Sequence, residues 1–227
     1  GGGGEFRLFA GQAIDVGEQV EISYGELDNS HLLAFYGFAE DDNAYDVVSV
    51  PSSILASVFR SVEETGDPPD LIWKDATIHL VPDASEGEDV GGEAWLRRGA
   101  VVDALRRYKY LGEESADKCR LFRGGVVSPD LEMLLRAWTL PEKLLLSPGA
   151  ASALAVAIGE GAPIAPEAER AAVAAKAELA RALLQGLFPS SLASDLDELD
   201  KAPLQGSRHA MLLRFRVSKK RLLAEMS

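Results

Sequence analysis

A short stretch near the N-terminus constrains the fold more than any other part of the chain. It runs from Gly17 to Gly25 and reads GEQVEISYG. Val20 and Ile22 alternate with polar residues, and this period of two predicts a β-strand with one apolar face. Tyr24 stands at the end of the predicted strand, where its ring can turn into a pocket and present its hydroxyl group. Gly25 then frees the backbone to turn away.

A short helix and a second aromatic pair follow the predicted strand. We expect Asn29 to cap the helix, because an asparagine side chain accepts a hydrogen bond from the first turn. Leu32 and Tyr36 recur at helical spacing, which predicts one buried face. Gly37 should end the helix, and Phe38 comes directly after it. The pattern therefore places three aromatic side chains near one turn of the chain.

A longer run resembles the C-terminal end of a SET domain. It extends from Gly17 to Val48 and reads GEQVEISYGELDNSHLLAFYGFAEDDNAYDVV. The likeness is to the branch with the Rubisco large-subunit lysine methyltransferase and the actin histidine methyltransferase, whose active-site tyrosine lies in a segment of the form GEQVxIxYG…SN…LL…YGF. The resemblance implies that Tyr24 orients the target nitrogen and the methyl group. It also implies that Tyr36 and Phe38 lie against the methyl donor, S-adenosylmethionine.

Two donor-binding motifs of that family do not occur in this sequence. One is a GxG-type glycine motif, and the glycine run of residues 1–4 lacks the strand and acidic partner expected after it. The other is an Asn-His pair shortly before the tyrosine strand. We therefore expect the chain to be the C-terminal portion of a larger protein and not to be an enzyme by itself. The alternative is a non-catalytic SET-like scaffold or interaction subunit, and the upstream sequence would distinguish the two.

The character of the sequence changes at Pro51. Residues 1–49 indicate strands and turns, ending in a strand over Tyr45–Val50, and we assign them to the C-terminal segment of the SET domain. Residues 50–227 are predicted to be mostly helical. They fit the general character of the family's helical substrate-binding domain, which implies docking of a protein substrate or partner. The sequence thus predicts an α+β fold, with a SET β remnant followed by a mostly α-helical domain.

Apolar spacing, capping residues and breakers place the elements of the second region. A strand pair or an extended segment is expected within Leu71–Val81, and an exposed loop over Ala84–Gly92. Two Ser-Pro pairs, at Ser128 and Ser147, are predicted to start helices. The first expected helix begins at Ser52 or Ser53. Further helices are expected over Ala94–Leu111, Leu131–Trp138, Ala153–Ile158 and Ala168–Leu187, and a final helix begins at Gly206.

Charge limits the classes of partner. The net charge is −13, whereas a general nucleic-acid binder normally carries a basic domain or stripe. Basic residues interleave with aromatic ones over Arg106–Tyr110, which we interpret as a solvated helix face. Others gather over Arg214–Arg221, where they complement the C-terminal end of a helix dipole, with a partner-docking patch as the alternative. We therefore expect no direct nucleic-acid binding.

Cysteine and histidine usage excludes two further classes of site. Cys119 is the single cysteine, so an internal disulfide is excluded, and the three histidines show no metal-ligand spacing.

No apolar run approaches the ~20 residues needed to span a membrane. We expect an intracellular protein without a metal site. The resemblance implies the chloroplast, with the cytoplasm and the nucleus as alternatives. It also implies a lysine target, with histidine as the alternative.

Overall fold

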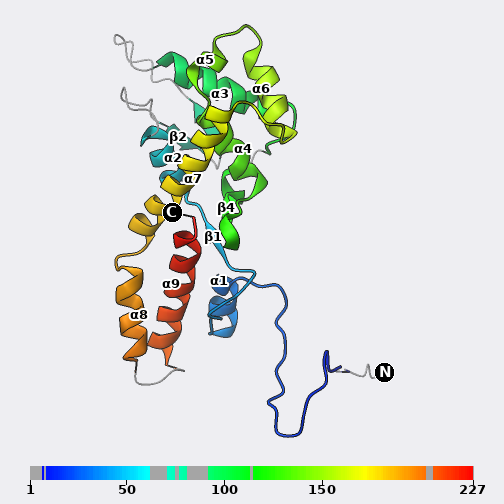
Figure 1. Ribbon diagram of the computed structural model, residues 1–227, viewed down its shortest axis with the longest axis vertical. Helices are drawn as coiled ribbons and strands as arrows, with labels where there is room; N and C mark the ends of the chain where they lie inside the picture. The colour runs from blue at the N-terminus through cyan, green and yellow to red at the C-terminus, as the bar shows by residue number, and fades with distance from the viewer. Residues whose placement is uncertain are drawn as a thin grey trace.

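The computed structural model describes Arg7 and residues 9–61, 71–74, 77–80, 92–112, 115–202 and 207–226. Over these residues the fold is α+β and mostly helical, as predicted. The molecule is elongated, with a group of helices at one end and the pair α8 (Leu192–Asp200) and α9 (Arg208–Ala224) at the other (Figure 1). The N-terminal residues form an arm that runs away from this body.

The apolar core lies among five helices of the larger end. These are α2 (Ser52–Ser61), α3 (Gly92–Arg107), α4 (Pro129–Trp138), α6 (Ala150–Gly159) and α7 (Pro166–Leu187). Helix α4 lies at the centre and contacts α3, α6 and α7. Its leucines recur at helical spacing and are fully buried, and the ring of Trp138 stacks on that of Phe59 at 5.3 Å between centroids. The predicted stripe of α4 is therefore confirmed as core.

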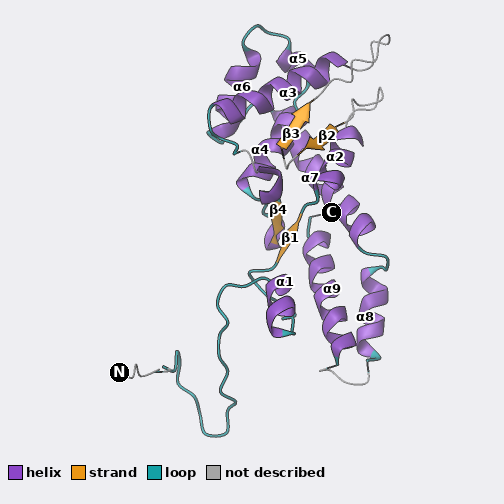
Figure 2. Cartoon of the chain, turned by 180° about the vertical axis from the view of Figure 1, so that it is seen from behind, coloured by secondary structure: helices purple, strands orange, loops and turns teal. Residues whose placement is uncertain are grey.

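Two small antiparallel sheets lie beside the helices (Figure 2). Strand β1 (Val47–Ser49) pairs with β4 (Arg120–Phe122), and Val48 faces Leu121 in that register. Both of these residues are buried in the core. The predicted strand pair is confirmed as β2 (Leu71–Lys74) and β3 (Thr77–Leu80). The β1–β4 sheet therefore joins the end of predicted region 1–49 to the middle of predicted region 50–227.

Helices α8 and α9 form an antiparallel hairpin that sequence reasoning identified only in part. Ser191 and Ser207 cap the two helices, each accepting a hydrogen bond from a backbone N–H at 3.1 Å. Helix α9 continues past α8 and packs against α7, β1 and α1 (Asn29–His31). A single helix thus contacts the start, the middle and the end of the chain.

The predicted helix starts meet mixed outcomes. Ser128 precedes α4 with Pro129 at the first helical position, as predicted, but its hydroxyl accepts a hydrogen bond from Arg120 N at 3.1 Å instead of capping the helix. The second Ser-Pro start is wrong, because α6 begins at Ala150 after the left-handed Gly149. Short α5 (Glu142–Leu145) precedes it. The predicted loop over 84–92 lies outside the described residues, except for Gly92 at the start of α3.

The N-terminal arm differs most from expectation. The structure assigns no strand to Val20–Tyr24. Strands are stable when their backbone groups pair with a neighbour, and none of the described residues supplies one here. The alternation of apolar residues is real, but both Val20 and Ile22 are exposed to solvent.

Candidate functional site

Three aromatic side chains predicted as site residues come together where the arm meets the body. The ring of Tyr24 lies 4.5 Å from that of Tyr36 and 5.4 Å from that of Phe38, measured between centroids. The two pairs are tilted by 56° and 59°, the kind of arrangement that aromatic quadrupoles favour. Tyr24 is 43% exposed and Tyr36 50% exposed. We call these three residues the aromatic cluster.

A π-helical turn positions two members of the cluster. It spans η1 (Leu32–Tyr36) and continues α1, so that helix and turn follow each other without a break. Gly37 ends the turn in the left-handed conformation, with φ at 79°, and donates to the Leu32 carbonyl at 3.0 Å. Phe38 follows directly. π-helical turns are rare and frequently occur at functional sites, because they change the direction of side chains within a helix.

The helix cap is not the residue that the sequence predicted. Asp28 caps α1, accepting hydrogen bonds from Ser30 N at 2.7 Å and His31 N at 3.3 Å. Asn29 is fully buried instead. Its Nδ2 donates to the Glu40 carbonyl at 2.9 Å, and the Glu40 amide donates to its Oδ1 at 2.9 Å. This reciprocal pair closes the segment 29–40 into a loop, and that loop carries Tyr36 and Phe38.

A buried polar network then joins the loop to the C-terminal helix. Asp46 is fully buried, and its carboxylate accepts from Asn29 Nδ2 at 3.2 Å and from Ser218 Oγ at 2.6 Å. Lys219 Nζ donates to Asp46 at 2.5 Å and to the Val47 carbonyl at 2.6 Å. Ser218 Oγ also accepts from Asn29 Nδ2 at 3.0 Å. We call Asn29, Asp46, Ser218 and Lys219 the Asn29 network.

A second buried network lies farther along the same helix. Lys220 Nζ donates to Asp195 at 2.5 Å, and both side chains are almost completely buried. Arg216 binds the other oxygen of Asp195 at 2.5 Å, and Ser190 Oγ donates to that carboxylate at 2.6 Å. We call these four residues the Asp195 network. Lys219 and Lys220 are neighbours in sequence, yet their side chains bind different parts of the fold. Lys219 binds Asp46 in the N-terminal region, and Lys220 binds Asp195 on α8.

These networks correct the interpretation of the basic C-terminal residues. Neither a solvated docking patch nor the helix dipole accounts for Lys219 and Lys220, since both are buried in ion pairs with aspartate. One sequence signal was available. Leu213, Val217 and Lys220 stand at positions i, i+4 and i+7 of one helical stripe. A lysine at the third position of an apolar stripe indicates a buried partner, because an unpaired buried charge is costly.

Hydrogen bonds and neighbouring cations keep Asp28 and Asp195 charged. Burial by itself would raise the pKa of Asp28, but hydrogen bonds from His31 and Ser30 and the charge of Lys219 outweigh it, so this pKa lies below its ordinary value. Burial likewise opposes ionisation of Asp195, and hydrogen bonds from Lys220 and Ser190 together with the charge of Arg216 lower its pKa. Both aspartates are therefore carboxylates at neutral pH.

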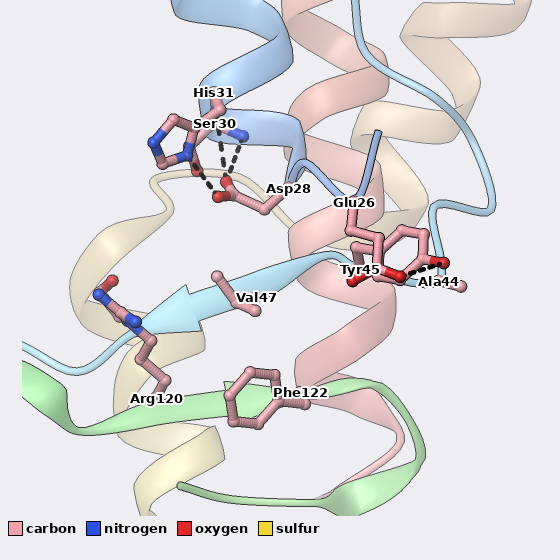
Figure 3. Close-up of a pocket in the computed structure, with 10 residues that line it drawn as sticks. Glu26, Asp28, Ser30, His31, Ala44, Tyr45, Val47, Arg120 and Phe122 are labelled. Carbon is pink, nitrogen blue, oxygen red and sulfur yellow. Dashed lines mark hydrogen bonds and ion pairs between the residues drawn. The ribbon is translucent and has the colours of Figure 1, made fainter. Parts of the chain in front are cut away.

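A groove of about 440 Å³ opens beside the Asn29 network (Figure 3). Its floor is the outer face of the β1–β4 sheet, with Val47 opposite Phe122. Asp28 and His31 lie on one side of it, with Asp28 Oδ2 and His31 Nδ1 joined by a hydrogen bond of 2.6 Å, and Glu26 lies on another side. An apolar floor with charged residues at the rim is a lining typical of ligand-binding clefts. The groove was not predicted from the sequence.

Other sequence candidates are resolved more simply. Cys119 is buried, and its Sγ contacts the Ser115 carbonyl at 3.4 Å, which suits a structural thiol. Over the described part of the chain, no group of three His, Cys, Asp or Glu side chains could hold a metal ion. Within the same residues, the helices are all too short or too polar to cross a bilayer.

Comparison with known proteins adds no relative to this picture: no family model, curated protein or solved structure matches the chain. The aromatic cluster, the two networks and the groove are accordingly interpreted from their own geometry and chemistry.

Proposed function

We propose that this chain is the C-terminal part of a SET-type protein N-methyltransferase that uses S-adenosylmethionine. Its target is a lysine side chain, with histidine as the alternative, and its helical domain docks the protein substrate. The observation that carries the proposal is the aromatic cluster. The sequence motif alone predicts Tyr24, Tyr36 and Phe38 as site residues. In the fold, the rings of Tyr36 and Phe38 lie 4.5 Å and 5.4 Å from the ring of Tyr24, measured between centroids.

The chemistry of methyl transfer suits such a cluster. The reaction needs the nitrogen, the methyl group and the leaving sulfur in line, so the site mainly has to orient them and exclude water. Aromatic faces attract the positive charge of a sulfonium, which fits the methyl-bearing end of S-adenosylmethionine. A tyrosine hydroxyl can accept weak C–H···O contacts from the polarised methyl group. Tyr24 and Tyr36 are half-exposed, so their rings are accessible to such a ligand.

The arm supports the same proposal. Val20 is 72% exposed and Ile22 65% exposed, on a stretch whose alternation suits a half-buried strand. Apolar strand faces are stable when another layer covers them. We propose that in the whole enzyme this stretch pairs with further SET strands, which complete the donor site around the aromatic cluster. The groove beside Asp28 would then lie next to the segment that holds the target nitrogen.

The test is donor binding and methyl transfer by the full-length protein. We expect calorimetry to detect S-adenosylmethionine binding, and we expect transfer of labelled methyl groups to a protein in cell extract. Tyr24→Phe should lower kcat by roughly 100-fold, since one positioned hydroxyl acts mainly in the transition state. Tyr108→Phe is the matched control, because Tyr108 has the same 43% exposure and lies outside the aromatic cluster.

Two results would count against the proposal. Full activity of Tyr24→Phe would remove the role given to this hydroxyl. A full-length protein that neither binds the donor nor transfers methyl groups would instead support the non-catalytic scaffold, in which the aromatic cluster is simply a packed surface feature.

A further inference from the structure

The loop that carries the aromatic cluster is fastened to a helix near the other end of the chain. Asn29 closes that loop through its reciprocal bonds to Glu40. The same Asn29 amide nitrogen contacts Ser218 at 3.0 Å across 189 residues of sequence. The loop therefore has two fixed points, one within itself and one on α9. Both fixed points use the side chain of Asn29, which is fully buried, and its hydrogen bonds are directional.

We propose that Ser218 and Lys219 are positioning residues for the aromatic cluster. They act through Asp46 and Asn29, which their side chains bind. This inference rests on the proposed function for its catalytic consequence, but the placement of the loop is testable without it. It assigns to the C-terminal helix a role in holding Tyr36 and Phe38 against Tyr24.

Apolar packing contributes little to holding the loop of residues 29–40 in place. Leu32 and Ala39 are the buried hydrophobic residues of segment 29–40. Tyr36 and the neighbouring Phe35 are exposed, so packing fixes the loop weakly. Asp46, by contrast, receives hydrogen bonds from the Asn29 amide, the Ser218 hydroxyl and the Lys219 ammonium. Removing Lys219 leaves a buried carboxylate without its counter-ion, and this carboxylate is what holds Asn29.

The chain supplies a closely matched control in the next residue. Lys219 and Lys220 are 4% and 1% exposed, and each binds a fully buried aspartate at 2.5 Å. Only the first belongs to the network that reaches the aromatic loop. Lys219→Met and Lys220→Met each remove a buried ammonium group, but Asp195 keeps Arg216 as a second cation when Lys220 is lost. The comparison therefore rests on where exchange changes, in segment 29–40 or in α8, and not on the size of the change.

The experiment compares both variants in the full-length protein by hydrogen–deuterium exchange and steady-state kinetics. In Lys219→Met, we expect the exchange rate over residues 29–40 to rise about tenfold relative to the wild type. A change of this size corresponds to the loss of one hydrogen bond to a charged group. We also expect kcat to fall about 10- to 100-fold with KM unchanged, since small misplacements of reacting groups act on the chemical step. Lys220→Met should speed exchange in α8 and leave segment 29–40 and kcat as in the wild type.

Equal effects of the two variants on segment 29–40 would overturn the inference, as would an unchanged loop in Lys219→Met. If the two lysine variants fail to fold, Ser218→Ala against Ser190→Ala makes the same comparison with a single hydroxyl removed from each network. If the wild-type protein transfers no methyl group, the proposed function fails. Exchange over residues 29–40 then decides the positioning role alone.

Discussion

Residues 9–46 and the described parts of residues 50–226 are held in place by different forces. The helical body buries a continuous set of leucines, alanines and aromatic rings around α4. Segment 9–46 buries two apolar residues, Leu32 and Ala39, and three polar ones, Asn29, Asn43 and Asp46. The helical body has an apolar core of its own, and segment 9–46 is attached to it through hydrogen bonds and an ion pair.

Apolar burial and hydrogen bonding differ in whether they fix the orientation of a side chain. Apolar burial has no direction, so it stabilises a body without fixing the angle of a single side chain. Hydrogen bonds weaken steeply when they bend, so a satisfied network fixes position. The aromatic cluster lies in the region held by such a network. Stability of the body and geometry of the cluster should therefore respond to different mutations.

The largest expected effect is on the apolar body. Trp138→Ala should cost about 3–5 kcal/mol of unfolding free energy, because it removes a large buried ring that stacks on Phe59. Denaturant unfolding followed by circular dichroism measures this loss. Leu212→Ala is the control, since Leu212 is 43% exposed and should lose no more than about 0.5 kcal/mol. Comparable losses in both variants would contradict the assignment of Trp138 to the core.

A smaller effect is expected in the polar region. Asn29→Ala should cost about 1–3 kcal/mol, because the Glu40 backbone groups and Asp46 lose a buried hydrogen-bond partner. Hydrogen exchange over residues 29–46 should rise while exchange in α4 stays slow. Exposed Gln185→Ala on α7 serves as the control. A uniform rise in exchange over the whole body would break the comparison, since it would make segment 29–46 part of the same cooperative unit.

Acid below about pH 3.8 should act on Asp28 and the Asp195 network more weakly than either truncation. The pKa values of Asp28 and Asp195 are lowered in the fold, so the unfolded chain binds protons first as the pH falls. Their contribution to stability is fully present above the ordinary aspartate pKa of 3.8 and is lost progressively below it. Near that pH the unfolded chain is only partly protonated, so the loss is partial. Amide exchange should rise first in segment 29–46 and in α8. Acid opening of α4 before these segments would contradict it.

The smallest expected effect is on the arm. Val20→Ser should change the stability of this chain by less than about 0.5 kcal/mol, because the side chain is 72% exposed. In the whole methyltransferase proposed above, the same substitution should cost about 1 kcal/mol or more if the strand face is covered there. Thermal unfolding of both proteins gives the two values, with Val126→Ser as an exposed-loop control in each. Equal, negligible losses would contradict the proposed strand pairing.

Local sequence signals predicted the helical body well. Helix α7 begins at a proline and runs through an alanine-rich stretch, and α4 follows the expected Ser-Pro start, because these preferences act within a few residues. The β2–β3 pair was also predicted from its β-branched and aromatic residues. The strand over Val20–Tyr24 was wrong for this structure, since a strand depends on a partner that its own sequence does not name.

The candidate site divides along the same line. Sequence alone determined that Tyr24, Tyr36 and Phe38 belong near one turn, because a helix and a glycine stop bring neighbouring residues together. Only the tertiary structure decided that Asn29 would leave the helix cap to Asp28 and bind Glu40, Asp46 and Ser218 instead. Helix capping depends on adjacent residues. The Asn29 network depends on distant residues that the packing of α9 brings next to Asn29, and the local sequence pattern does not show which residues these are.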